Sequence, residues 1–189
     1  MRHTGPMRVQ RSFAFLDLSG FTRFTDLHGD EEAVRLLTRF RAHVREAASD
    51  HAVRVDKWLG DGVMLVSTKE ERLVEASVGL MRAGVLAEAT GGLPLRGGIA
   101  AGPVLLLEGD DYVGSSVNLA SRLCSAAGPG EMLATASIAD ALPDGTTAIP
   151  RGALALPGFT TPIEVICIGD ETALALRRDE TALTFPKAG

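Results

Sequence analysis

The chain has 189 residues, of which 46% are hydrophobic and 23% are charged, and its formal net charge is -5 at pH 7. This length and composition indicate one globular domain with its own core, and they exclude an intrinsically disordered chain. The acidic balance argues against broad nucleic-acid binding, because neutralising a phosphate backbone needs a basic face.

A short apolar run at residues 12–16 is the first predicted element, a buried strand that stops at Asp17 and a Ser-Gly turn. Residues 1–10 before it are predicted to form a loose N-terminal arm. A helix should follow, with Asp30 as its N-cap and acidic residues in a first turn that the helix dipole favours. Its apolar residues recur at helical spacing: Ala33, Leu36, Leu37, Phe40 and Val44.

The next predicted element is a β-hairpin, with strands at residues 53–57 and 63–66 on either side of a Gly-Asp-Gly turn centred on Asp61. A capping-box pattern then begins at Thr68, where a glutamate follows three residues later. This pattern predicts a helix that continues to about Ala89.

The second half of the chain starts with a small and apolar stretch at residues 96–107, which predicts a strand interrupted near Gly102 and Pro103. Residues 116–127 predict a helix that a Gly-Pro pair ends. Short strands are expected around Met132, around Leu154 and at residues 163–168, with a small helix after Thr135.

The order of these elements is β-α-β-β-α-β with additions. It predicts an α+β fold with a ferredoxin-like βαββαβ core, extra strands and helices, and an antiparallel sheet covered by helices. One domain is therefore expected over residues 11–170, followed by a C-terminal tail at residues 171–189. Such a fold hosts many functions, so the site residues must decide the function.

Two carboxylates are predicted to meet at one edge of the sheet. Asp17 ends the first strand and Asp61 lies at the tip of the hairpin, and these elements are neighbours in a β-α-β-β unit. Close carboxylates repel each other unless a cation lies between them, and Mg²⁺ or Mn²⁺ suits such hard oxygen ligands. Taken singly, each aspartate also suits a turn or a loop cap, so spacing alone leaves both interpretations open.

Two further features are weaker signals. The loop with Gly20, Phe21 and Thr22 follows Asp17 and leads into a helix, so its free backbone N–H groups suit phosphate binding. Asn118 and Arg122 are four residues apart and project from one helix face, where a guanidinium suits a phosphoryl group but a solvated surface is the simpler interpretation.

Four segments in order resemble the signature segments of class III adenylyl and guanylyl cyclases. They are residues 15–22, 57–64, 98–104 and 111–123. The resemblance covers about residues 11–170. It implies that the domain is a cyclase catalytic domain, in which Asp17 and Asp61 hold two divalent metal ions (Mg²⁺ or Mn²⁺) with the Leu18 carbonyl as a further ligand.

The resemblance also implies roles for the remaining site residues. Lys57 and Asp111 match the pair that reads the adenine edge, which is chemically sensible because lysine donates to N1 and aspartate accepts from the 6-amino group. Asn118 would orient the ribose and Arg122 would stabilise the α-phosphate, while Arg96 would contact the terminal phosphates. The implied reaction is the conversion of ATP to cyclic AMP and pyrophosphate.

The family forms head-to-tail dimers in which one chain gives the two metal-binding aspartates and its partner gives the other site residues. The resemblance therefore implies a homodimer with two complete sites and an inactive monomer. One position departs from the pattern, since Pro157 stands where many family members carry a phosphate-contacting lysine.

Three alternatives remain beside an adenylyl cyclase. One is a catalytically weak or inactive cyclase homology domain that binds nucleotide or dimerises for regulation, and Pro157 is the only feature that favours it. Another is a guanylyl cyclase, against which Lys57 and Asp111 argue. A diguanylate-cyclase or polymerase-palm enzyme would also have carboxylates at strand ends, but its Gly-Gly-Asp/Glu-Glu-Phe hairpin is missing.

The sequence further predicts a cytoplasmic protein without a membrane segment. No apolar run reaches the roughly 20 residues that a membrane-spanning helix needs, and the basic N-terminus lacks the apolar stretch of a signal peptide. Two cysteines far apart in the sequence fit a reducing compartment.

Overall fold

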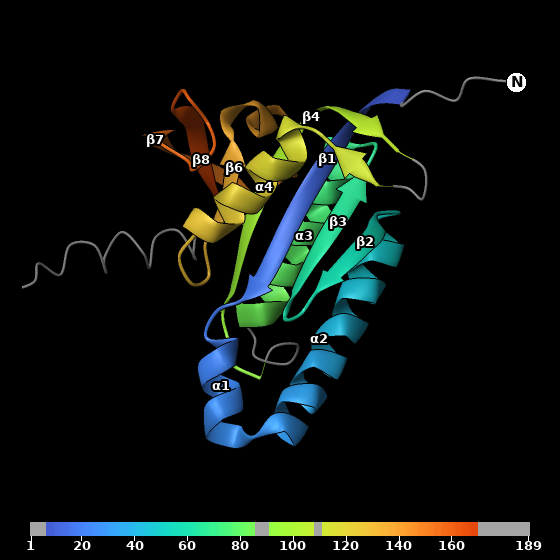
Figure 1. Cartoon of the computed structure of the whole chain (residues 1–189), viewed down its shortest axis with the longest axis vertical. Coiled ribbons are helices and arrows are strands. Elements are labelled where there is room, and N and C mark those ends of the chain that lie inside the picture. Colours follow the sequence, from blue (N-terminus) through green and yellow to red (C-terminus); the bar gives the residue numbers. More distant parts are fainter. Residues whose placement is uncertain (1–6, 86–90, 108–110, 170–189) are drawn as a thin grey trace, which may run out of the picture.

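The computed structural model describes residues 7–85, 91–107 and 111–169, and they form one sheet flanked by helices (Figure 1). Eight strands contribute to the sheet, in the order β2-β3-β1-β4-β6-β8-β7, with β5 paired to β4. The elements in chain order are β1 (Met7–Leu18), α1 (Phe21–His28), α2 (Asp30–Asp50), β2 (Arg54–Leu59), β3 (Gly62–Ser67), α3 (Glu70–Val85), β4 (Leu95–Leu106), β5 (Tyr112–Val113), α4 (Ser115–Ala126), β6 (Met132–Thr135), the 3-10 helix η1 (Ala136–Ala141), β7 (Thr147–Leu154) and β8 (Ile163–Gly169).

The first four strands form the predicted ferredoxin-like core. β1 lies between β3 and β4 and is antiparallel to both, and β2 is antiparallel to β3. The α+β prediction is confirmed. One pair departs from a purely antiparallel sheet, because β6 is parallel to β4. That pairing follows from the helix α4 between them, since a helical crossover returns the chain in the same direction.

Helices cover the two faces of the sheet unequally. Figure 1 shows α4 in front of the sheet and α3 behind it, with α2 beside β2. A hydrophobic core lies on each face of the sheet. Alternate residues of β1 point into these two cores, because side chains along a strand point to opposite faces. Leu16 packs in the core under α2 and α3, whereas Phe13 packs in the core under α4. Since α4 is the only helix on its face among the described residues, the part of that face over β2 and β3 has no helix above it.

Strand β1 is longer than the sequence predicts, and β4 is continuous where an interruption is predicted. β1 begins at Met7, so residues 7–10 of the predicted arm belong to it and pair with residues 103–106 of β4. In this stretch Met7, Arg8 and Gln10 are exposed, and only Val9 is half-buried. The predicted interruption of β4 is wrong, because Gly102 and Pro103 pair in register with β1. The missing N–H of Pro103 is tolerated there, since β6 pairs only with residues 97–99 of β4.

Helix boundaries also differ in detail. Asp30 is the first residue of α2 and not its cap, which is Gly29 with a φ of 82°. A separate helix, α1, fills the stretch before it. The predicted capping box at Thr68 is wrong, because α3 begins at Glu70 and the hydroxyl of Ser67 accepts the hydrogen bond from the Lys69 backbone N–H at 3.0 Å.

The bounds of the hairpin strands and of α4 agree with the prediction within one or two residues. The buried residues of α2 include four of the five predicted from spacing, and Leu37 is half-buried. The predicted end of α3 near Ala89 and the tail at 171–189 lie outside the described residues. No helix in the described part of the chain is long and apolar enough to cross a membrane.

Candidate active site

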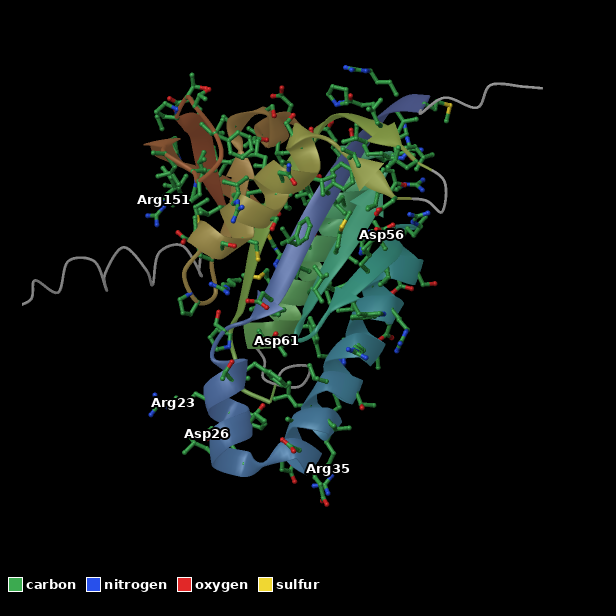
Figure 2. All side chains as sticks on the ribbon, viewed as in Figure 1. Arg23, Asp26, Arg35, Asp56, Asp61 and Arg151 are labelled. Carbon is green, nitrogen blue, oxygen red and sulfur yellow. The ribbon has the colours of Figure 1, made fainter. Side chains whose placement is uncertain are left out.

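The strand order brings Asp17 and Asp61 to one edge of the sheet. Asp17 pairs in register with Gly62, the residue directly after Asp61. Asp61 lies at the end of the sheet that faces α1 (Figure 2). A Cβ atom on Gly62 would lie 3.2 Å from Oδ1 of Asp17 and 3.0 Å from the Leu16 carbonyl oxygen, so a side chain there would crowd β1 and the Asp17 carboxylate.

The two carboxylates influence each other electrostatically. Partial burial raises the pKa of Asp61, and the negative charge of Asp17 raises it further, while its own backbone N–H and the charge of Arg96 oppose the shift. Among the described residues, no group of three or more His, Cys, Asp or Glu side chains is arranged to hold a metal ion. Two carboxylates fit Mg²⁺ or Mn²⁺ nonetheless, because such ions take one or two carboxylates from the protein and further oxygens from substrate phosphates and water.

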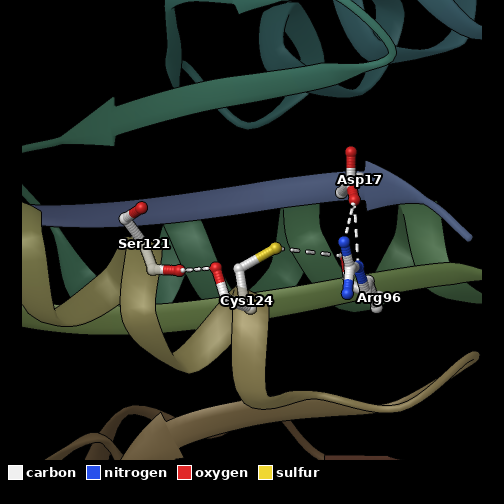
Figure 3. Close-up of polar contacts among 5 residues, drawn as sticks. Asp17, Arg96, Ser121 and Cys124 are labelled. Atoms are coloured by element: carbon white, nitrogen blue, oxygen red, sulfur yellow. Dashed lines mark hydrogen bonds and ion pairs between the residues drawn. The ribbon is translucent and has the colours of Figure 1, made fainter. Parts of the chain in front are cut away.

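Arg96 adds a positive charge to this edge. It pairs in register with Asp17 across β1 and β4. Its Nε and Nη2 atoms both donate to Oδ2 of Asp17, at 2.9 and 2.6 Å (Figure 3). This hydrogen bonding raises the pKa of Arg96. The thiol of Cys124, on α4, contacts the Arg96 carbonyl oxygen at 3.8 Å, and burial raises the pKa of that thiol to about 12, so it stays protonated.

The loop after Asp17 turns directly into α1. Leu18 is buried and pairs with Leu95, and the backbone N–H of Ser19 donates to the Pro94 carbonyl at 2.8 Å. Gly20 precedes the helix with a φ of 85° and no side-chain cap. Phe21 and Thr22 are the first helical residues, and N–H groups of a first turn have no partner within the helix. The backbone therefore offers donors beside the carboxylates, as the sequence predicts for a phosphate-binding loop.

Lys57 and Asp111 form an ion pair although 54 residues separate them. Lys57 faces the α4 side of the sheet, since it pairs in register with Met64 of the core under α4. The hydrogen bond between the two side chains raises the pKa of Lys57 and lowers that of Asp111. Both side chains are about half exposed, at 47% and 51%, so they remain open to a ligand.

Asn118 and Arg122 lie on the solvent side of α4. The opposite side packs on β4 so tightly that a Cβ atom on Gly98 would lie 2.2 Å from the Cys124 nitrogen. Both polar residues are exposed, and within the described residues neither side chain makes a hydrogen bond or ion pair. One chain therefore shows the carboxylate edge, the Lys57–Asp111 pair and the α4 pair as three separate groups.

Two further observations concern residues beside these groups. Pro157 is exposed in a turn where the Phe159 N–H donates to the Leu156 carbonyl at 3.1 Å, and no cationic side chain replaces a lysine within that turn. Arg41 of α2, which the sequence analysis missed, donates to the carbonyl oxygen of Gly60 in the hairpin that carries Asp61, at 3.3 Å. No local sequence pattern indicates this contact. It follows from the position of Arg41 on the face of α2 that packs against β2, which the fold reveals.

Comparison with known proteins decides the family. The sequence profile of the adenylate and guanylate cyclase catalytic domain matches residues 9–168. The chain belongs to this family. The match begins in β1 and ends in β8, so it includes every element described above.

Relatives of this cyclase domain are found among actinobacterial proteins. An uncharacterized protein of Mycobacterium tuberculosis is 44% identical over 156 residues, which are 82% of this chain and 40% of the relative. A pH-sensitive adenylate cyclase of the same species is 34% identical over 140 residues, or 74% of this chain and 34% of the relative. The cyclase domain thus spans about two fifths or less of these relatives.

Solved structures share the fold. The adenylyl cyclase CyaB from P. aeruginosa matches with a TM-score of 0.80 at 24% identity, covering 88% of this chain and 97% of that one. A guanylyl cyclase structure matches with a TM-score of 0.75 at 22% identity, covering 88% and 95%. Both nucleotide specificities thus occur on this architecture.

Proposed function

We propose that this cyclase domain is an adenylyl cyclase that converts ATP to 3′,5′-cyclic AMP and pyrophosphate. The observation that carries the proposal is the pairing of Lys57 with Asp111 on the open face of the sheet. Together they present one donor and one acceptor, which complement N1 and the 6-amino group of adenine. The relationship to a mycobacterial adenylate cyclase at 34% identity supports the same choice.

The carboxylate edge is proposed to hold two divalent metal ions, Mg²⁺ or Mn²⁺. Asp17, Asp61 and the Leu18 carbonyl would be the ligands from the protein. Bound there, the ions would lower the pKa of the ribose 3′-hydroxyl and neutralise charge on the phosphates. The raised pKa of Asp61 supports this assignment, because a carboxylate that is poorly compensated in the free protein gains most from a cation.

The other site residues are proposed to hold the nucleotide. Arg96 and the N–H groups after Gly20 would bind the terminal phosphates, since both offer donors next to the carboxylate edge. Asn118 would orient the ribose, and Arg122 would stabilise the charge that develops on the α-phosphate. The 3′-hydroxyl would lose its proton to water and its oxygen would attack the α-phosphorus, the bond from phosphorus to the bridging oxygen would break, and pyrophosphate would leave.

The complete site is proposed to lie between two copies of the chain. Asn118 and Arg122 point to solvent from α4 and make no contact with Asp17 or Asp61 within one chain. A partner chain that packs on the open face of the sheet would bring its α4 pair and its Lys57–Asp111 pair to the carboxylates. By symmetry a homodimer then has two sites, and a monomer has none.

A second candidate is a regulatory module that binds nucleotide without turnover. Pro157 favours it, because the turn where family members carry a lysine offers no cation to the phosphates. The two candidates are separated by measuring cyclic nucleotide formation from ATP and from GTP, each with Mg²⁺ and with Mn²⁺. Cyclic AMP from ATP alone supports the proposal. Cyclic GMP from GTP at a comparable rate would overturn the base assignment, and ATP binding without any product would favour the regulatory module.

A further inference from the structure

The hairpin turn that carries Asp61 receives little support from its own strands. Gly60 and Asp61 form a two-residue turn between Leu59 and Gly62, which pair in register. Gly60 has a φ of 68°, as the first central residue of such a turn often does. The backbone N–H of Asp61 acts on its own carboxylate and lowers the pKa of that group. Its position therefore depends on the orientation of the Gly60–Asp61 peptide.

Arg41 is the side chain that reaches this peptide from another element. It extends from α2, and its Nη2 atom donates to the Gly60 carbonyl oxygen at 3.3 Å. The guanidinium carbon lies 5.1 Å from the centroid of the Trp58 ring, within range of a cation–π contact. Trp58 packs in turn against the core under α2 and α3. The Nε atom of Arg41 is buried and has no hydrogen-bond partner among the described residues. Arg41 therefore carries a desolvation cost at this position.

Arg45, one helical turn further along α2, provides a natural comparison. Its guanidinium carbon lies 5.3 Å from the same Trp58 ring. Within the described part of the chain it makes no hydrogen bond to the turn. The two arginines thus share charge, helix and aromatic contact, and they differ in the bond to the Gly60 carbonyl.

We infer that Arg41 is a positioning residue for the metal site: its bond to the Gly60 carbonyl fixes the turn so that the Asp61 carboxylate stands opposite Asp17. The inference rests on the proposed function, in which these two carboxylates bind metal. Arg41 acts through the turn and touches neither metal nor nucleotide. Metal ligands need such support, because a loosely held turn lets the carboxylate leave the orientation that binds the metal.

Charge alone makes the opposite prediction. A guanidinium near a cation site repels the cation, so removing it without any change in the turn should tighten metal binding. Loss of positioning should weaken metal binding, because Asp61 then samples other orientations. The sign of the effect of Arg41→Ala therefore separates the two explanations, and Arg45→Ala reports the effect of charge and ring contact alone.

Two measurements on the full chain test the inference. The first is the affinity for Mn²⁺ without nucleotide, followed by electron paramagnetic resonance of the free ion. We expect Arg41→Ala to weaken binding about fivefold to tenfold, which is the size of one ordinary protein hydrogen bond. Arg41→Lys keeps the charge and a donor, so it should recover part of this loss. Arg45→Ala should bind within about twofold of the parent or slightly more tightly.

The second measurement is amide hydrogen exchange of the turn in the absence of metal. Arg41→Ala should speed exchange at residues 60–62 while the centre of β3 stays protected, and Arg45→Ala should leave the turn unchanged. Thermal unfolding checks that each variant is folded, and Arg41→Lys serves if the alanine variant is not. Unchanged exchange in both Arg41 variants overturns the inference, as does Mn²⁺ binding to Arg41→Ala that equals or exceeds that of the parent.

A separate variant distinguishes failure of the proposed function. Asp61→Asn should weaken Mn²⁺ binding far more than any Arg41 variant. If it does not, the metal assignment of the proposed function is wrong. In that case the hydrogen exchange of the turn still decides whether Arg41 fixes its geometry.

Discussion

Arg96 and Asp17 face each other across β4 and β1, and two nitrogens of the guanidinium donate to one oxygen of the carboxylate. In the proposed active site both groups have other partners, since Asp17 binds metal and Arg96 binds phosphate. Each is therefore neutralised by the other in the free protein. Binding of Mg²⁺ or Mn²⁺ with nucleotide would exchange this pair for two new ones without leaving a charge uncompensated.

Substitution Arg96→Gln should separate these two roles. Loss of a charge-assisted contact to the phosphates should raise the KM for ATP by about tenfold or more. Without nucleotide, Mn²⁺ should bind more tightly than to the parent, because Asp17 has lost a competing cation. Steady-state kinetics and Mn²⁺ titration measure the two effects. Arg35→Gln, a change at a surface arginine that pairs with Glu31 and Glu32 on α2, should alter neither value.

The raised pKa of Asp61 predicts how the metal-free protein responds to pH. Because the pKa of Asp61 in the folded protein lies above its ordinary value, the ionised carboxylate destabilises the folded state at neutral pH. This cost disappears below the pKa of the unfolded chain. Asp61→Asn should therefore raise the Tm at pH 7 by about 1–3 °C, since the group is only partly buried and solvent screens the effect. The gain should vanish near pH 3. Thermal unfolding in a chelator measures it, and a lower Tm at pH 7 would contradict the assignment.

The exposed pair of Lys57 and Asp111 should affect nucleotide choice more than stability. Lys57→Ala should lower kcat/KM for ATP by about 10- to 100-fold, the effect of one or two lost hydrogen bonds to a base. The Tm should change little, because exposed ion pairs contribute little to folding. The double change Lys57→Glu with Asp111→Cys should move the preference towards GTP. Equal ATP turnover by Lys57→Ala and the parent would argue that this pair does not read the base.

Gly98 should be intolerant of a side chain because α4 lies directly on it. A Cβ there would lie 2.2 Å from the Cys124 nitrogen and 2.3 Å from the Ala120 carbonyl oxygen, and backbone atoms cannot move aside singly. Gly98→Ala should destabilise the fold by about 3 kcal/mol or more. Gly79→Ala, on α3 with nothing within 4 Å, should instead stabilise it by about 0.5–1 kcal/mol. Urea unfolding of the two variants tests the contrast.

Elements with strong periodicity were predictable from the sequence. The helix with Leu36 and Phe40 and the hairpin around Asp61 were recovered, because one face of each is buried and the other is not. The approach of Asp17 to Asp61 followed from the order of strands alone. The first four residues of β1 were not predicted, since three of them are exposed and only Val9 packs against a core.

Contacts set by tertiary register were beyond the sequence. The pairing of Arg96 with Asp17 depends on the alignment of β1 with β4, and nothing local to either residue specifies it. Lys57 and Asp111 are 54 residues apart, so only the family resemblance indicated that they belong together. Arg41 was missed for the same reason, as its bond to Gly60 joins a helix to a turn 19 residues away.

The shared site is the central claim, and complementation between two inactive chains tests it most directly. Asp17→Ala and Arg122→Ala should each be inactive as homodimers, because each lacks one half of both sites. Mixed in equal amounts with free subunit exchange, half of the dimers contain both chains and one intact site of two, which predicts about a quarter of the parent cyclic AMP formation. A mixture that stays inactive although differently tagged chains are shown to exchange would contradict the shared site.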